Sequence, residues 1–224
     1  MFQILYEDES VIVAHKPAGL AVQTARTSQK DMVSMLKTYL VSQGHSPYVG
    51  IIHRLDQPVE GIILFAKTKE AAANLTGQVT RRQLGKKYRA VVWLSREDIA
   101  KKGRLEDFLR KDAKTNTSYV VSGEEPGAKK AILDYEVVRC QGHLAEVDIA
   151  LRTGRHHQIR VQMSCAGMPL VGDLKYGIGK ANELEGADRN VALCAAELDW
   201  IHPVTGEKMH SKTQPQNKSF QLLA

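Results

Sequence analysis

Short apolar segments recur along this 224-residue chain, and their length and β-branched composition are typical of strands. Residues 2–6 and 11–14 flank an acidic turn at 7–10 and predict a β-hairpin. Further strands are expected at 49–55, 62–66, 88–94, 132–138, 144–151 and 191–200. Strands therefore dominate the predicted structure.

Three segments have a helical pattern instead. Apolar residues recur at helical spacing in 31–41, with Asp31 near the start of the helix. Residues 70–79 are rich in alanine, and 155–166 are followed by Gly167, which suits a helix C-cap. Long connections between the apolar segments favour a mixed sheet with helices on its faces.

The remaining segments are polar. Residues 95–130 hold few large apolar side chains and many charges, which predicts short strands and loops attached to the sheet, not a separate domain. Residues 177–189 are loop-like, and the tail from His210 is expected to be loose. We therefore expect a single domain over 1–224.

Composition narrows the class of protein. Hydrophobic residues make up 43% and charged residues 25%, a balance typical of globular proteins. The net charge of +6 can attract phosphate backbones, but also anionic lipids and acidic proteins. Three cysteines without a CxxC pair argue against a disulfide framework. The absence of a signal-like leader and of a long apolar span predicts a soluble, cytoplasmic protein.

Three polar stretches could carry chemistry. His53-Arg54-Leu55-Asp56 lies between two apolar segments, where rigid strands could hold a catalytic loop. The stretch 154–162, GRHHQIRVQ, opens a predicted helix, where free backbone N–H groups attract anions. The stretch 81–89 holds five basic residues in nine beside Tyr88. Each alone is explained as well by a turn, a solvated helix start or a solvated charge run.

Taken together and in order, these stretches resemble the RluA-type pseudouridine synthases. The chain carries HRLDQPVEGIILFAK, KYRAVV and GRHHQIRVQ, and also VIVAHKPAGLAVQ, VGDLKYG and LDWIHPVTGEKM. The resemblance covers about residues 4 to 209. It implies an α+β fold, with a mixed, largely antiparallel β-sheet and helices and loops around a central catalytic cleft. It also implies isomerisation of uridine to pseudouridine in rRNA or tRNA.

The resemblance also implies roles for individual residues. Asp56 matches the catalytic aspartate, Tyr88 the active-site tyrosine, and Arg160 the arginine that pairs with the aspartate. Arg54 matches the arginine that displaces and replaces the target base. Further positions of the motifs or of the basic stretch are expected to contact substrate: His53, Arg155, Gln158, Lys86 and Lys87.

The sequence departs from the family pattern at several motif positions. Val59 and Glu60 replace the usual Thr-Ser, His156 replaces the usual Thr of the GRTHQ motif, and Gln162 replaces its final His. These changes leave the proposed carboxylate in place but put the loop geometry or the choice of RNA in question. We expect no S4-type RNA-binding module before the domain, and we expect the catalytic domain itself to bind RNA.

The expected chemistry is redox-neutral, so no cofactor and no metal is implied. Asp56 could attack the ribose or abstract a proton from it, and the residues do not decide between these. An Arg160–Asp56 ion pair would keep the aspartate ionised. Tyr88 could stack on uracil or help to remove the proton from the ring carbon. A structured RNA is the expected partner, with no membrane and no obligatory protein partner, and we expect a monomer.

Three other interpretations differ in what they require of the chain. A catalytically silent RNA-binding protein would be consistent with Val59-Glu60. A base-excising glycosidase would use Asp56 and Glu60 as a carboxylate pair and would release free uracil. A zinc site is disfavoured because the histidines and cysteines lack ligand spacing.

Overall fold

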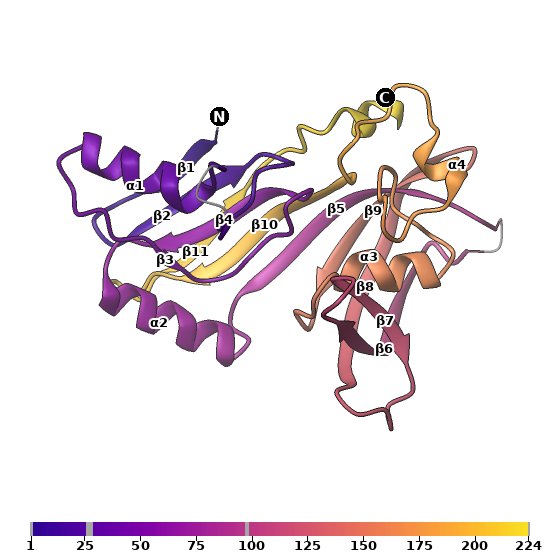
Figure 1. Ribbon diagram of the computed structural model, residues 1–224, viewed down its shortest axis with the longest axis horizontal. Helices are drawn as coiled ribbons and strands as arrows, with labels where there is room; N and C mark the ends of the chain where they lie inside the picture. The colour runs from indigo at the N-terminus through magenta and orange to yellow at the C-terminus, as the bar shows by residue number, and fades with distance from the viewer. Residues whose placement is uncertain (1, 26–28, 97–98, 224) are drawn as a thin grey trace. The chain divides into compact units, whose positions relative to one another are not determined.

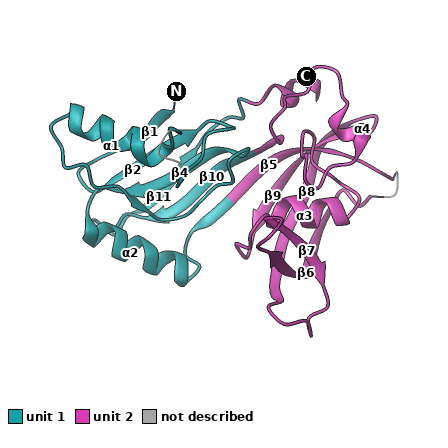
Figure 2. Ribbon diagram, viewed as in Figure 1, with its two compact units in different colours: residues 1–86, 194–216 teal, residues 87–193, 217–224 magenta. Residues whose placement is uncertain are grey.

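The computed structural model describes residues 2–25, 29–96 and 99–223 (Figure 1). These residues form two compact units, which Figure 2 shows in separate colours. Unit 1 contains residues 1–86 and 194–216, and unit 2 contains 87–193 and 217–224. The expected single domain over 1–224 stays a prediction. No described helix has the length and apolar composition needed to cross a membrane.

Unit 1 is built on a sheet with two helices. Its strands follow the order β1-β2-β4-β10-β11, and β3 also pairs with β4. All these pairs are antiparallel except β4–β10, which is parallel. The elements are β1 Gln3–Glu7, β2 Val11–Lys16, α1 Met32–Ser42, β3 Gly50–Ile51, β4 Glu60–Ala66, α2 Lys69–Thr80, β10 Leu193–Ile201 and β11 Lys208–Lys212.

Every residue of β2 and β4 is buried, so both faces of this part of the sheet are covered. On one face, Ala71 and Leu75 of α2 pack with Val13, Leu64 and Trp200 in one hydrophobic cluster. Strands buried on both faces are continuously apolar, as these two are over most of their length. The two strands thus give the loop before β4 a rigid support.

The hairpin and the first two helices confirm the sequence predictions. The side chain of Asp31 accepts from the backbone N–H of Ser34, and the Ser34 hydroxyl accepts in turn from the N–H of Asp31, which forms a capping box. The prediction of a strand over 49–55 is wrong, because only Gly50–Ile51 pairs with β4. Ile52 and Leu55 are buried, but their backbone has left the sheet and forms the loop that carries Asp56.

Unit 2 is built on strands in the order β5-β9-β8-β6-β7. The β9–β8, β8–β6 and β6–β7 pairs are antiparallel. The elements are β5 Gly85–Trp93, which begins in unit 1, β6 Lys102–Asp112, β7 Thr117–Val121, β8 Lys129–Gln141, β9 Leu144–Leu151, α3 Gln158–Cys165, α4 Gly179–Asn182 and the 3-10 helix η1 Lys218–Leu223. Helix α3 packs against β6 and β7 (Figure 1).

Three predictions for the polar segments of the chain are corrected. The polar region 95–130, of which residues 97 and 98 lie outside the described residues, contains the long strand β6 and not only short strands. Its exposed and less exposed residues alternate, since an antiparallel sheet can leave one face to water. The loop-like stretch 177–189 contains the short helix α4. The tail is ordered as β11 and η1, because Phe220 and Leu223 are buried.

The predicted helix 155–166 begins later, at Gln158. His157 has a left-handed backbone with φ of 54°, which an L-residue cannot continue as an α-helix. The end of α3 is as expected: Gly167 has φ of 80°, and the amide N–H groups of Gly167 and Met168 donate to the carbonyls of Ser164 and Met163. This is a Schellman motif. The sequence prediction of a mixed, largely antiparallel α+β fold is confirmed.

Candidate active site

Asp56 lies in the loop that joins β3 to β4, and its side chain is half-buried. The loop turns directly after it, since the N–H of Val59 donates to the carbonyl of Asp56 at 3.0 Å. Gln57 and Gly19 are bonded reciprocally: Gly19 N–H donates to Gln57 O at 2.9 Å, and Gln57 Nε2 donates to Gly19 O at 3.0 Å. Gly19 makes this approach with φ of 83°, a conformation that favours glycine.

Lys16, at the end of β2, is completely buried below this loop. Its ammonium donates to the carbonyls of Pro17, Leu20 and Gln57, at 3.0, 2.7 and 3.1 Å. Burial lowers the pKa of Lys16 to about 8, while the carboxylates of Asp56 and Glu60 act against this shift. Lys16 was not predicted as a site residue, although it belongs to the HKPAGL segment.

His53 is buried in the interior of unit 1. Its Nε2 accepts from the N–H of Leu64 at 3.2 Å, and among the described residues its Nδ1 has no hydrogen-bond partner. Burial, and secondarily the charge of Lys86, lower the pKa of His53 well below its usual range. A neutral His53 therefore links the loop to β4, and its contact with substrate stays a prediction.

The predicted site residues of the β3–β4 loop and of the start of β5 differ in exposure. Arg54 and Lys87 are exposed, whereas Tyr88 is 8% exposed. Lys86 is half-buried, and loss of hydration lowers its pKa to about 8. Arg89, from the same basic stretch, forms ion pairs with Asp148 and Glu146, at 2.8 and 3.2 Å. Part of this stretch thus holds the sheet of unit 2 together.

Arg160 lies in α3 and is buried, with an exposed fraction of 4%. Its Nε and Nη2 each donate to one oxygen of Asp173 at 2.7 Å, a bidentate pair. The guanidinium also lies over the ring of Tyr176, 5.2 Å from its centroid. Asp56 belongs to unit 1, so the Arg160–Asp56 ion pair stays a prediction. Asp173 and Tyr176 were missed as site residues, although both belong to the VGDLKYG motif.

Gln158 forms hydrogen bonds that connect the loop before α3 to strand β8. Its Oε1 accepts from Thr153 Oγ1 at 2.8 Å and from the N–H of Arg155 at 3.0 Å, and its Nε2 donates to Ile132 O at 3.1 Å. Arg155 Nε donates to Lys130 O at 2.9 Å. These bonds give both residues a place in the loop structure, and their predicted contact with substrate is untested.

The histidines beside them form a polar cluster. The rings of His156 and His157 are stacked at 3.7 Å, His156 Nδ1 lies 2.9 Å from Ser118 Oγ, and His157 Nδ1 lies 2.8 Å from the Tyr176 hydroxyl. His156, which replaces the usual Thr, therefore links the β6–β7 hairpin to the start of α3.

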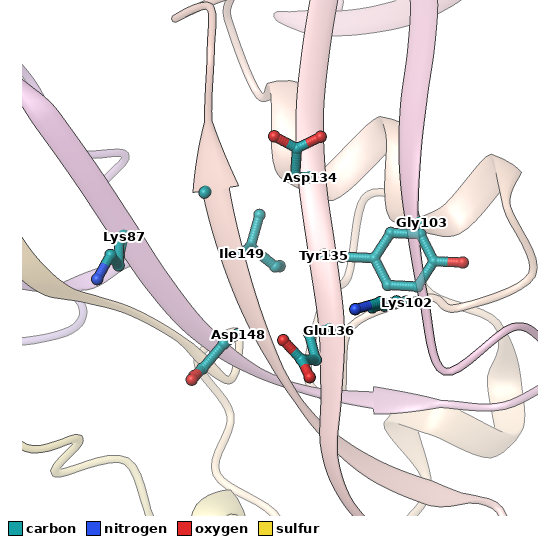
Figure 3. Close-up of a pocket in the computed structure, with 9 residues that line it drawn as sticks. Lys87, Lys102, Gly103, Asp134, Tyr135, Glu136, Asp148 and Ile149 are labelled. Atoms are coloured by element: carbon teal, nitrogen blue, oxygen red, sulfur yellow. The ribbon is translucent and has the colours of Figure 1, made fainter.

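Unit 2 also has a pocket of about 410 Å³ between β5, β6, β8 and β9 (Figure 3). Its lining carries two ammonium groups, from Lys87 and Lys102, and three carboxylates, from Asp134, Glu136 and Asp148. Such a mixed lining does not favour an anionic phosphate. Apart from Lys87, the pocket contains none of the predicted site residues.

Comparison with known proteins identifies the family. Residues 10–165 match the family model of RNA pseudouridylate synthase. Over 231 residues the chain is 30% identical to the ribosomal large subunit pseudouridine synthase D of Zymomonas mobilis, covering 99% of this chain and 71% of that one. The chain belongs to the RluA-type RNA pseudouridine synthases. They are isomerases, as the sequence resemblance implied.

A second relative and a solved structure are also similar to this chain. An uncharacterized RNA pseudouridine synthase of Bacillus subtilis, YhcT, is 33% identical over 207 residues, covering 91% of this chain and 65% of its own. The chain thus spans about two thirds of the length of these curated relatives. The human RNA pseudouridylate synthase domain containing 1 has the same fold, with a TM-score of 0.78 at 21% identity over 96% of this chain and 84% of its own.

Proposed function

We propose that this chain isomerises uridine to pseudouridine in a structured RNA, ribosomal or transfer, with Asp56 as the essential carboxylate. The observation that carries the proposal is the support of the Asp56 loop. Lys16 and Gly19 both donate to the carbonyl of Gln57, the residue after Asp56, from the end of a fully buried strand and the turn that follows it. A catalytic carboxylate needs such a rigid support.

The same geometry argues against a glycosidase with two acting carboxylates. Such an enzyme needs both carboxyl groups to reach the sugar. Glu60 is 2% exposed, and its Oε1 accepts from the backbone N–H of Gln216 at 2.9 Å. Glu60 is therefore part of the interior of unit 1, and Asp56 is the carboxylate that we assign to the reaction.

The remaining roles are those that the resemblance to the family implies. Asp56 attacks the ribose or takes a proton from it, with Arg160 as its counter-charge. Arg54, an exposed planar cation, fills the space left by the extruded uridine. Tyr88 stacks on the uracil or assists proton removal, and Lys87 binds phosphate. Because the Zymomonas mobilis relative carries the name of a ribosomal large subunit enzyme, large-subunit ribosomal RNA is the first substrate to test.

Tritium release tests this function. RNA labelled with tritium at carbon 5 of uridine is taken from cells that lack this gene and incubated with wild type and Asp56→Ala. Forming the new carbon–carbon bond expels tritium into water, so wild type releases it and the variant does not. Asp199→Ala removes an exposed aspartate of unit 1, paired with His210, and should keep full activity.

The other outcomes are equally informative. RNA binding without release by wild type would support the catalytically silent RNA-binding protein instead. Release of free uracil would indicate a glycosidase. Release by Asp56→Ala at the wild-type rate would refute the role of Asp56.

A further inference from the structure

The VGDLKYG motif, residues 171–177, contains a tight turn to which the proposed reaction assigns no role. The carboxylate of Asp173 accepts from the amide N–H groups of Lys175 and Tyr176, at 2.9 and 3.2 Å. The N–H of Gly177 donates to the carbonyl of Asp173 at 2.7 Å, and a Cβ on Gly177 would clash with that oxygen. The turn therefore places Tyr176 next to the carboxylate that binds Arg160.

Tyr176 is held at its backbone, its hydroxyl and its ring. Its carbonyl accepts from Ser164 Oγ of α3 at 2.5 Å. Its hydroxyl accepts from the N–H of Ser118 in β7 at 2.7 Å and lies 2.8 Å from Nδ1 of His157. The side chain also packs against an apolar cluster of Leu109, Ala131 and Val161. Contacts from β6, β7, β8 and α3 thus fix the orientation of the ring.

The guanidinium of Arg160 lies over this ring, with Cζ at 5.2 Å from the ring centroid. That distance is within the range of a cation–π contact. The two bonds to Asp173, from Nε and Nη2, lie in the plane of the guanidinium. Bonds in that plane resist its tilting less than a ring on its face does. The ion pair and the ring therefore restrict different motions of Arg160.

We propose that Tyr176 is a positioning residue for Arg160: its ring fixes the plane of the guanidinium that Asp173 binds at one edge. This inference rests on the proposed function, in which Arg160 is the counter-charge of the catalytic carboxylate. The orientation of a guanidinium decides which of its N–H groups can reach a carboxylate. In this role Tyr176 acts through Arg160 and not on the RNA itself.

NMR of the arginine side-chain nitrogens tests the positioning directly, on the full chain and without RNA. The signals of Arg160 are assigned from Arg160→Lys. Rotation of the guanidinium about its Nε–Cζ bond breaks its contacts with both Asp173 and the ring. Tyr176→Leu removes the ring but keeps Asp173, so this rotation should become about tenfold faster. Tyr176→Phe keeps the ring, and its rotation rate should stay within about threefold of that of the wild type.

Tritium release tests the consequence for the reaction. Arg160 is assigned to the reacting carboxylate and not to RNA binding. Tyr176→Leu should therefore lower kcat about tenfold and leave KM within about twofold of the wild-type value. Tyr176→Phe should recover most of this kcat, because the ring is the part of the side chain that contacts the guanidinium.

A matched control separates this role from simple loss of structure. Tyr135→Leu also removes a tyrosine of unit 2, one that is 9% exposed and whose ring lies against Gly103. It should lower the free energy of unfolding but keep the kcat of the folded enzyme and the rotation rate of Arg160. If Tyr176→Leu does not fold, Tyr176→Met replaces it with the same expectations, since methionine fills irregular gaps in a core.

An unchanged rate of guanidinium rotation in Tyr176→Leu would overturn the inference. So would a kcat of Tyr176→Phe as low as that of Tyr176→Leu, or equal losses of kcat in Tyr176→Leu and Tyr135→Leu. Absence of tritium release by the wild type would instead refute the proposed function. The NMR comparison would then still decide whether Tyr176 fixes Arg160, which keeps the two failures distinguishable.

Discussion

Lys16 of unit 1 and Arg160 of unit 2 are both buried cations, but the groups around them differ. Arg160 forms a bidentate ion pair with Asp173, with both distances at 2.7 Å. Lys16 donates to three backbone carbonyls and has its carboxylates, Asp56 and Glu60, as longer-range charges. Arg160 is in direct contact with a carboxylate, whereas the Lys16 ammonium is hydrogen-bonded to backbone carbonyls.

The choice of residue explains why the two arrangements behave differently. A guanidinium stays charged at any pH that a protein tolerates, and its planar shape matches a carboxylate. An ammonium is a point charge that loses its proton when burial is costly enough. The two units should therefore respond differently to mutation and to pH, and three predictions test this difference.

The largest effect is expected when Arg160 loses its partner carboxylate. Asp173→Asn should lower the free energy of unfolding by about 3 kcal/mol, near the lower end of the range for breaking a buried pair, because the amide oxygen can still accept. Urea unfolding at pH 7 measures this loss. Asp148→Asn is the matched control: its side chain, 46% exposed, pairs with Arg89, so solvent screening should keep the loss under about 1 kcal/mol. Equal losses would show that burial of the Arg160 pair has no special importance.

Part of the fold and of the candidate site could be predicted from the sequence. Local signals were sufficient for the Asp31 capping box, the Gly167 cap and the placement of Asp56 on a loop before a buried strand. The resemblance then assigned Asp56 and Arg160 to one reaction. These predictions needed only neighbouring residues or motifs whose order along the chain is visible.

The contacts around Lys16 and Arg160 could not be predicted in this way. The Lys16 contact with Gln57 spans 41 residues, and the Glu60 contact with Gln216 spans 156. A lysine beside a proline-glycine turn usually lies in solvent, so only the fold shows that this one is buried. The region of β6 was predicted to hold only short strands and loops, because the charged side chains of this long strand lie on an open face and interrupt the apolar run that identifies a buried strand.

Lys16 should make the free energy of unfolding depend on pH. Its pKa is about 8 in the folded protein and near 10.5 when exposed, so between these values the unfolded chain binds more protons. Stability from this group therefore rises with pH across that window, by roughly 3 kcal/mol at about 1.4 kcal/mol for each pKa unit. Lys16→Met should lack this rise.

The measurement is the difference in unfolding free energy between wild type and Lys16→Met at pH 7.5, 9 and 10. Taking the difference cancels the contribution of Lys86, whose lowered pKa has the same sign in both proteins. A difference that stays constant over this range would contradict the protonation behaviour assigned to Lys16, and with it the contrast to Arg160.

The smallest effect is expected from the neutral groups around Arg160. Tyr176→Phe keeps the ring below the guanidinium but removes a hydroxyl that accepts from the N–H of Ser118 at 2.7 Å and lies 2.8 Å from His157 Nδ1. Ser118 is 1% exposed, so its amide loses a partner that water cannot easily replace. The expected loss is about 1–2 kcal/mol in urea unfolding, and it should not vary between pH 7.5 and 9.

Tyr119→Phe is the matched control for this change, because Tyr119 is 46% exposed and its hydroxyl can be replaced by water. A loss for Tyr176→Phe as large as that for Asp173→Asn would mean that Arg160 depends on the whole polar cluster and not on its ion pair. Arg160 and Lys16 would then differ less, since both cations would be stabilised mainly by neutral dipoles. A loss confined to about 1–2 kcal/mol would leave the carboxylate as the group that distinguishes the two sites.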